Sequence, residues 1–285
     1  MNLITPSRIF QQAQTIKEVL NNVEVLFADI GIYPKWDEFG KSYNLPIIYD
    51  DYSTLLNISY YSNAIHFSIK TENKKLYCLG FNITISDNNR LHGSIGSVNK
   101  YATCMIPQIK TGTWLMNFVN SFLCFIGIRE ATLEDASRIK CGKYEADLLL
   151  LRVFSGNFYT WYENFGYVPD YYDDPNKKVL ALTTMQTLYN FPAINIFTDK
   201  VQYKTYYYQD IEINISEIYH HYPPGTVLGD VEIPSLLGPY MTFLWKINCA
   251  YYAQIETYMQ NTDGRWYPLL QILHNLSDHT NKNLC

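Results

Sequence analysis

Residues 106–133 read IPQIKTGTWLMNFVNSFLCFIGIREATL, and this stretch decides the fold. Its apolar residues recur three and four positions apart, as on the buried face of an amphipathic helix. They are Trp114, Leu115, Phe118, Val119, Phe122, Leu123 and Ile126. Gly127 stands where a helix often ends, and the following run at 128–133 is typical of a strand. The stretch therefore predicts a helix that starts at about Thr113, with a strand directly after it.

Strands are also predicted before this helix. Apolar and polar residues alternate there in short runs that turn residues separate. The predicted strands are 64–70, 75–85, 90–98 and 101–106. Gly93 and Gly96, in the third of them, indicate a β-bulge or the close approach of another segment.

The first 63 residues predict less regular structure. Residues 5–7 (Thr-Pro-Ser) offer a helix cap, and the apolar spacing after them predicts a helix that ends at residues 21–22. Segment 23–32 is mostly apolar and is either a strand or a second short helix. Segment 33–63 is rich in aromatic residues and predicts a loop-rich surface.

The chain after residue 133 predicts alternating elements. Helices are expected at 143–154 and 158–165, and a strand begins at 167. The polar segment 170–176 is the best candidate for a domain boundary. Beyond it, strand-like runs precede a helical end; these are 179–188, 194–197 and 203–215, with helix from 236.

Together these elements predict an α/β (α+β) fold. The expected core is a mixed, mostly antiparallel and splayed sheet that helices flank. We expect three regions: 1–63 with the first helix and the aromatic loops, 64–170 as the sheet-containing core, and 171–285 as a C-terminal extension of strands and helices.

Composition excludes some classes of function. The 285 residues carry 22 Lys and Arg against 27 Asp and Glu, a net charge of -5, and no basic stripe. Nucleic-acid binding is therefore not expected. No run of 18 apolar residues occurs, so we expect no membrane span, and the run from 236 to 255 is read as a buried core helix.

The six cysteines form no C-x-x-C pair and no cluster with zinc spacing. No secretory signal precedes them, so reduced thiols in a cytoplasmic protein are the expectation. No metal site is predicted.

The junction before the central helix is a candidate anion site. Gly112 allows close approach of the backbone, the first N–H groups of the helix are unpaired, and Lys110 adds positive charge. A diphosphate could bind there, although most strand-to-helix junctions contain similar residues.

From these residues a resemblance emerges. Lys110-Thr-Gly-Thr-Trp-Leu-Met116, the strand ending at Leu133, and Trp161-Tyr-Glu-Asn-Phe-Gly-Tyr167 resemble motifs of the GNAT superfamily of N-acetyltransferases, particularly divergent members encoded by large DNA viruses. The family writes its diphosphate loop Q/R-x-x-G-x-G/A, and Lys110 stands here at the first glycine. The resemblance covers about residues 65–170.

The resemblance implies a reaction and the residues for it. Acetyl-CoA would donate its acetyl group to an amine of a small molecule or protein, with Tyr162 returning a proton to the thiolate. Glu134 or Asp135, after the strand at 128–133, would be the base, and His66 and His92 are weaker options. The implied cofactor-binding residues are Ala102, Thr103, Cys104, Met105, Ile106, Lys110, Thr111, Gly112, Thr113 and Asn157.

A second hypothesis stays open. The chain could be an inactive relative with the same fold, used as a viral structural or interaction protein. Its aromatic-rich surface, with 26 tyrosines in the chain, could bind an assembly partner or a second copy. Any single tyrosine among so many, Tyr162 included, is more often structural than catalytic.

Overall fold

The computed structural model divides the chain into two compact units. Unit 1 comprises Met1–Glu134, Phe165–Val168 and His279–Cys285, and unit 2 comprises Asp135–Asn164 and Pro169–Asp278. The described residues are 10–36, 41–50, 52–61, 63–71, 76–85, 89–98, 104, 111–133, 138–193, 205–208, 211–214, 227–228, 231–232, 236–262, 264, 266–277 and 280–285. The three regions expected from the sequence stay a prediction; the two units group residues 1–134 together and return the C-terminal residues to unit 1.

Unit 1 contains one mixed, mostly antiparallel sheet. Its eight strands are ordered β1-β2-β3-β4-β5-β6-β14-β9. Their bounds are β1 Ser42–Tyr49, β2 Tyr52–Tyr61, β3 Ala64–Lys70, β4 Tyr77–Ile85, β5 Leu91–Val98, β6 Glu130–Leu133, β9 Val168–Pro169 and β14 Thr280–Asn283. Strands β1 to β5 form an antiparallel meander, and β6 runs parallel to β5. The predicted fold class, α+β with a mostly antiparallel mixed sheet flanked by helices, is confirmed.

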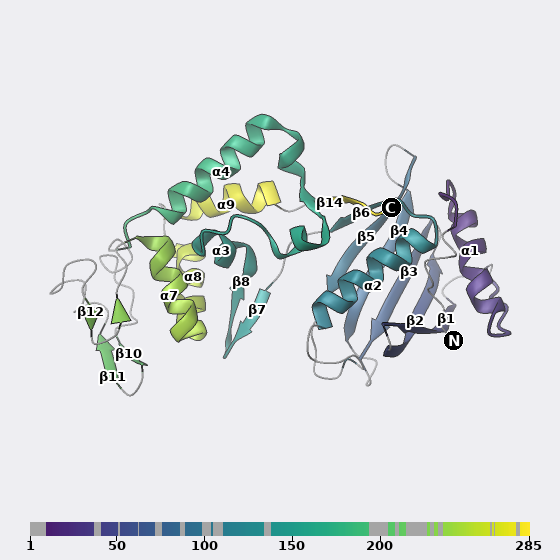
Figure 1. Ribbon diagram of the computed structural model, residues 1–285, viewed down its shortest axis with the longest axis horizontal. Helices are drawn as coiled ribbons and strands as arrows, with labels where there is room; N and C mark the ends of the chain where they lie inside the picture. The colour runs from purple at the N-terminus through teal and green to yellow at the C-terminus, as the bar shows by residue number, and fades with distance from the viewer. Residues whose placement is uncertain are drawn as a thin grey trace. The chain divides into compact units, whose positions relative to one another are not determined.

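Helices α1 (Ile16–Ala28) and α2 (Thr111–Phe125) cover the apolar face of this sheet. The ring of Phe122 in α2 lies 5.4 Å from that of Phe67 and 6.0 Å from that of Phe81. Phe27 of α1 lies 6.1 Å from Tyr43, whose place in the strand register puts it on the same face as Phe67. Figure 1 shows α2 lying across the strands. Strands β3, β4, β5 and β6 and the helix α2 were predicted and are confirmed.

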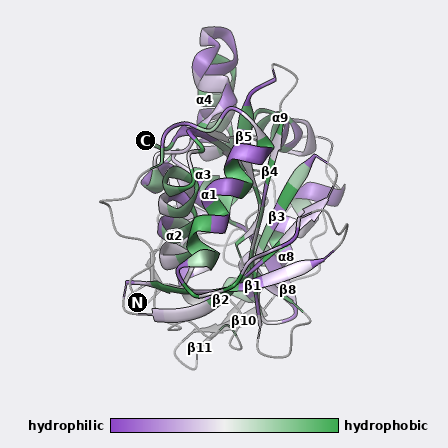
Figure 2. Ribbon diagram, turned by 90° about the vertical axis from the view of Figure 1, so that its right-hand side faces the viewer, coloured by the Kyte–Doolittle hydropathy of each residue, from purple (hydrophilic) through white to green (hydrophobic). Residues whose placement is uncertain are grey.

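The first helix differs from its prediction. Thr15 caps α1 with its hydroxyl, and the helix continues through residues 21–22 to Ala28. It continues because Val19, Val23 and Leu26 keep the helical spacing and are buried. In Figure 2 the green hydrophobic residues of α1 alternate with purple hydrophilic ones, as in an amphipathic helix. The expected cap at residues 5–7 lies outside the described part.

The prediction of a loop-rich surface at 33–63 was wrong over most of its length. Strands β1 and β2 form a hairpin in full register from Tyr49–Tyr52 to Ser42–Ser59. Asp50, with φ 51°, lies in its turn. The hairpin escaped prediction because β1 is an edge strand, where polar residues and Pro46 are tolerated on the outer side.

Four of the six cysteines form disulfides, so the expectation of reduced thiols was wrong for these four. Cys78 at β4 is bonded to Cys104, and Cys124 at the end of α2 is bonded to the last residue, Cys285. The other two cysteines, Cys141 and Cys249, are outside any disulfide. Spacing alone carried no signal for these pairs, because their partners are 26 and 161 residues apart.

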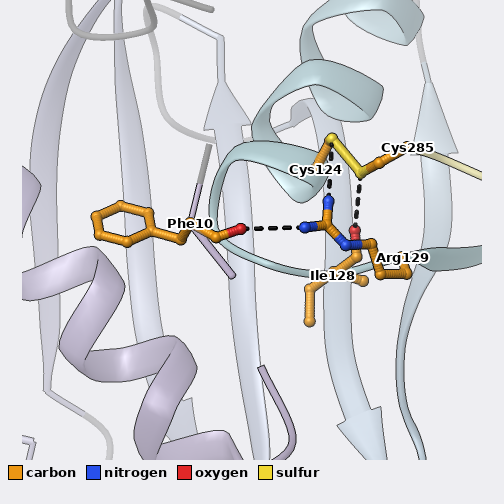
Figure 3. The surroundings of a disulfide bond; sticks show 5 residues. All are labelled: Phe10, Cys124, Ile128, Arg129 and Cys285. Atoms are coloured by element: carbon orange, nitrogen blue, oxygen red, sulfur yellow. Dashed lines mark hydrogen bonds between the residues drawn. A yellow bond between two sulfur atoms is a disulfide. The ribbon is translucent and has the colours of Figure 1, made fainter. Parts of the chain in front are cut away.

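Arg129 forms hydrogen bonds to three segments of unit 1 beside the Cys124–Cys285 disulfide (Figure 3). Its Nη1 donates to Cys124 Sγ at 3.4 Å, and its Nη2 donates to the carbonyl oxygen of Phe10 at 3.1 Å. Its own carbonyl oxygen accepts from the N–H of Leu284 at 2.7 Å. The end of α2, the N-terminal segment and the C-terminal strand are thus held at one point.

Unit 2 is mainly helical around one hydrophobic core. Its longer elements are the hairpin β7 (Arg138–Cys141) and β8 (Tyr144–Asp147), and the helices α3 (Leu148–Phe154), α4 (Pro175–Tyr189), α7 (Leu237–Ile247), α8 (Cys249–Thr262) and α9 (Tyr267–Ser277). Short elements are the 3₁₀ helices η1 (Trp161–Phe165) and η2 (Asp170–Asp173) and the strands β10 (Thr205–Tyr208), β11 (Ile211–Asn214), β12 (Val227–Leu228) and β13 (Val231–Glu232). Trp266, Tyr252 and Phe154 are fully buried in the core.

Two predictions for unit 2 need correction. The run at 179–188 is part of the helix α4, which Asp174 caps by accepting from the N–H groups of Asn176 and Lys177. The expected helix at 143–154 is the strand β8 followed by α3. The sequence reading took the hairpin strand β8 as the first part of a helix. It took Asp174, which caps α4, as part of a polar boundary segment. The run at 194–197 lies outside the described residues.

The disulfide of Cys285 should contribute strongly to the stability of unit 1. Cys285→Ser is expected to lower the free energy of unfolding by about 2–4 kcal/mol, because the bond closes a very long loop. Urea unfolding without reductant measures this, with Cys249→Ser as a control outside the disulfides. Equal stability of Cys285→Ser and the wild type would contradict the assignment.

Candidate functional site

The candidate site lies where the parallel strands β5 and β6 meet. Three residue pairs join them, from Gly93–Ala131 to Ile95–Leu133. Parallel neighbours need a crossover connection, and α2 provides it. A Cβ on Gly93 would lie 2.8 Å from Cδ1 of the buried Leu123, so glycine permits the close packing of α2 on β5.

A β-bulge follows this pairing directly. The register between β4 and β5 changes from Phe81–Ile95 to Gly80–Ser97, which leaves Gly96 as the extra residue. The described β6 ends at Leu133, so no described strand pairs with that edge of β5 beyond Ile95. The predicted bulge or close approach at these glycines is confirmed.

The start of α2 lies at the same end of the sheet. Because α2 returns the chain from the end of β5 to the start of β6, its N-terminus lies toward the C-terminal end of β5. Gly112 and Thr113 form its first turn and are partly exposed. Trp114 anchors that turn, since its Nε1 donates to the carbonyl oxygen of Tyr49 at 3.2 Å. First-turn N–H groups lack intrahelical acceptors and can bind an anion.

The structure describes only some of the predicted cofactor residues. Gly112 and Thr113 come together at the start of α2, and Thr111 begins the helix. Cys104 is buried in its disulfide with Cys78. Of the strand predicted at 101–106, only Cys104 is described, and the described neighbours of β6 in the sheet are β5 and β14. Predicted residues outside the described part are Ala102, Thr103, Met105, Ile106, Lys110, Glu134 and Asp135.

The other predicted site residues lie in unit 2. Tyr162 is buried in η1, and its ring centroid lies 5.0 Å from that of Trp161. Glu163 stabilises this short helix by accepting from the N–H of Thr160 at 3.1 Å. Asn157 is exposed in the preceding loop.

The two histidines considered as weaker bases are engaged with neighbouring strands. His66 Nδ1 is hydrogen-bonded to Asn82 Oδ1 at 2.7 Å, and His92 Nε2 lies 3.3 Å from the hydroxyl of Thr84. The strand register puts both on the face opposite to Phe67, and hence away from α2. Neither therefore lies on the α2 side of the sheet.

Sequence reasoning missed a buried acidic cluster in unit 2. Asp147 caps α3 by accepting from the N–H groups of Leu149 and Leu150, and its own N–H donates to Glu256 Oε1 at 2.7 Å. His274 Nε2 lies 3.7 Å from Asp147 Oδ2. The partners are 109 residues apart, so the only sequence signal was an aspartate directly before an apolar helix.

Burial controls the protonation of this cluster. Burial, and after it the neighbouring charge of Asp147, raises the pKa of Glu256 to about 8 against the hydrogen bonds that lower it. Burial also raises the pKa of Asp147, although His274 opposes this. Burial raises the pKa of Tyr252, and the neighbouring Glu256 charge acts in the same direction. The cluster is thus a proton-bearing part of the core.

Comparisons with known proteins give no relative. No protein-family model matches the chain, and no curated protein or solved structure matches it. None of the helices described is both long and apolar enough to cross a membrane. Within the described ranges, no group of three His, Cys, Asp or Glu side chains could bind a metal ion.

Glu256 should make stability depend on pH. The pKa of Glu256 is about 8 in the folded protein and 4.5, the ordinary value for a glutamate, in the unfolded chain. Between these pH values the folded protein therefore holds one more proton than the unfolded chain. Stability from this group is therefore lost as pH rises from 4.5 to 8 and is constant above. Glu256→Gln cannot ionise, so we expect its stability relative to the wild type to rise by about 2–4 kcal/mol from pH 5 to pH 8.

Urea unfolding at several pH values measures this difference. Glu24→Gln, at a partly exposed position on α1, is the matched control and should show no such trend. A Glu256→Gln difference that stays constant over this range would show that Glu256 holds no extra proton in the folded state.

Proposed function

We propose that the chain is a coenzyme-A-dependent N-acyltransferase of the GNAT type. The observation that carries the proposal is the bulge at Gly96, directly after the last residue pair between β5 and β6. It bends β5 at the point where its edge has no described strand partner. The amide groups of an extended pantetheine arm could form strand-like hydrogen bonds to residues 96–98 there.

The start of α2 supports the same ligand. The parallel connection puts Gly112 and Thr113 at the end of the sheet where β5 leaves β6. Their N–H groups would bind the diphosphate of coenzyme A, and Lys110 would add charge. The thioester and the diphosphate would thus be bound by consecutive parts of one strand–helix connection.

Proton transfer needs groups beyond this connection. Glu134 or Asp135 would take the proton of the attacking amine, as the resemblance implies. The resemblance assigns the return of a proton to the thiolate to Tyr162, and this role stays a prediction. The net reaction moves the acyl group from sulfur to nitrogen and leaves free coenzyme A.

An inactive protein used as a scaffold is the second candidate. Leu55 and Tyr61 on β2 are 55% and 44% exposed, which favours a partner surface on this strand. The disulfides favour an oxidising location over the cytoplasm. An origin in a large DNA virus stays a prediction.

Acetyl-CoA should stabilise the chain if the proposal is right. A thousandfold excess over Kd is expected to add about 4 kcal/mol, seen as a higher Tm. Gly112→Trp should abolish the rise, because the indole would fill the diphosphate position. Gly264→Trp is the control, since Gly264 is exposed with open space around it.

Calorimetric titration of both variants at 25 °C separates lost binding from poor folding. Wild-type protein whose Tm does not respond to acetyl-CoA, together with self-association in light scattering, would favour the scaffold.

Tyr162→Phe should reduce turnover and leave cofactor binding intact. We expect kcat to fall by about 10²–10⁴-fold, because the leaving thiolate loses its proton donor. Thiol release from acetyl-CoA, with spermidine and a lysine peptide as acceptors, measures the rate. Tyr159→Phe, at an exposed tyrosine three positions earlier, should keep the wild-type rate. Unchanged turnover in Tyr162→Phe would remove Tyr162 from the mechanism.

A further inference from the structure

Two thiols outside the disulfides meet in unit 2. Cys141 is the last residue of β7, and Cys249 is the first residue of α8. The thiol of Cys141 is hydrogen-bonded to that of Cys249. Cys141 is buried in the core, whereas Cys249 packs against that core and is partly exposed. One thiol of the pair is therefore accessible to a reagent and the other is not.

The backbones that carry these thiols approach closely. A Cβ on Gly142 would lie 3.6 Å from the Cβ of Ala250, and these residues directly follow the two cysteines. The end of the strand β7 and the start of α8 are therefore in direct contact, and each cysteine lies one residue before the point of contact on its own segment.

We propose that Cys141 and Cys249 are a redox-active dithiol that a low-molecular-weight disulfide, such as oxidised glutathione, converts into a further disulfide. The thiolate of Cys249 attacks the glutathione disulfide, forms a mixed disulfide and releases one glutathione thiolate. The thiolate of Cys141 then attacks Cys249 Sγ and releases the second. Two protein thiols are oxidised, one glutathione disulfide is reduced, and both thiol protons pass to the released glutathione or to water.

The second step should be slow at neutral pH. Burial, together with the neighbouring Cys249 thiol and the charge of Glu256, raises the pKa of Cys141 to about 12. Tyr252 on α8 and Tyr144, across the hairpin from Cys141, are the other titratable groups around it. The thiolate fraction of Cys141, and with it the closure rate, should rise about tenfold per pH unit below that value.

Peptide mapping tests the proposal on the full-length protein. The folded protein is incubated with oxidised glutathione at pH 7 and pH 9, alkylated and digested with trypsin without reduction. Cleavage after Lys140, Lys143, Lys246 and Arg265 releases each thiol in its own peptide. We expect peptide 141–143 linked to peptide 247–265, formed about 100-fold faster at pH 9 than at pH 7.

Cys249→Ser is the matched variant. It should form no such linked peptide, keep Cys141 as an alkylatable thiol, and retain the links of 76–90 to 101–110 and of 111–129 to 283–285. Two wild-type results would overturn the proposal. One is glutathione that stays on Cys249 beside a free Cys141 at pH 9, and the other is Cys141 linked to any other cysteine.

Discussion

The packing of α2 on the sheet is the constraint on which unit 1 depends. Phe122 lies against Phe67 and Phe81 on neighbouring strands, and Leu123 occupies the space that Gly93 leaves open. This contact covers the apolar face and also lets the chain return to start β6 parallel to β5. The bulge at Gly96 and the first turn of α2 owe their common location to the same crossover. The location of the candidate site therefore follows from how α2 packs on the sheet.

Local pattern predicted the parts of the fold that local pattern can specify. Strands β3, β4 and β5 alternate apolar and polar residues, and α2 has helical spacing, because each buries one face. These patterns could therefore be recognised in the sequence. Strand β14 was not predicted, because Thr280–Asn283 has little strand propensity and is a strand only through its pairing with β6. The helix α4 was misassigned because its apolar residues are not confined to one face, and Val179, for example, is 64% exposed.

The candidate functional residues also fall into two groups: those that the local sequence indicates and those that only long-range packing brings together. Gly96 and Gly112 could be singled out, because a glycine within a strand or before a helix has a local meaning. The association of Asp147 with Glu256 could not, since it depends on packing between β8 and α8 across 109 residues. The disulfides were missed for the same reason. The proposal of an acyltransferase depends on the local signals, whereas the proposed redox pair and the buried acidic cluster of unit 2 depend on the non-local ones.

The place of β14 in the sheet affects how the chain folds during synthesis. Strands β1 to β6 emerge from the ribosome first, but the neighbour of β6 consists of residues 280–283, which follow the whole of unit 2. The edge of β6 therefore stays open while about 150 further residues are translated, roughly 10 s at typical rates. An open edge can pair with another chain, so nascent unit 1 is most exposed to aggregation in this interval, which ends once the C-terminal strand arrives.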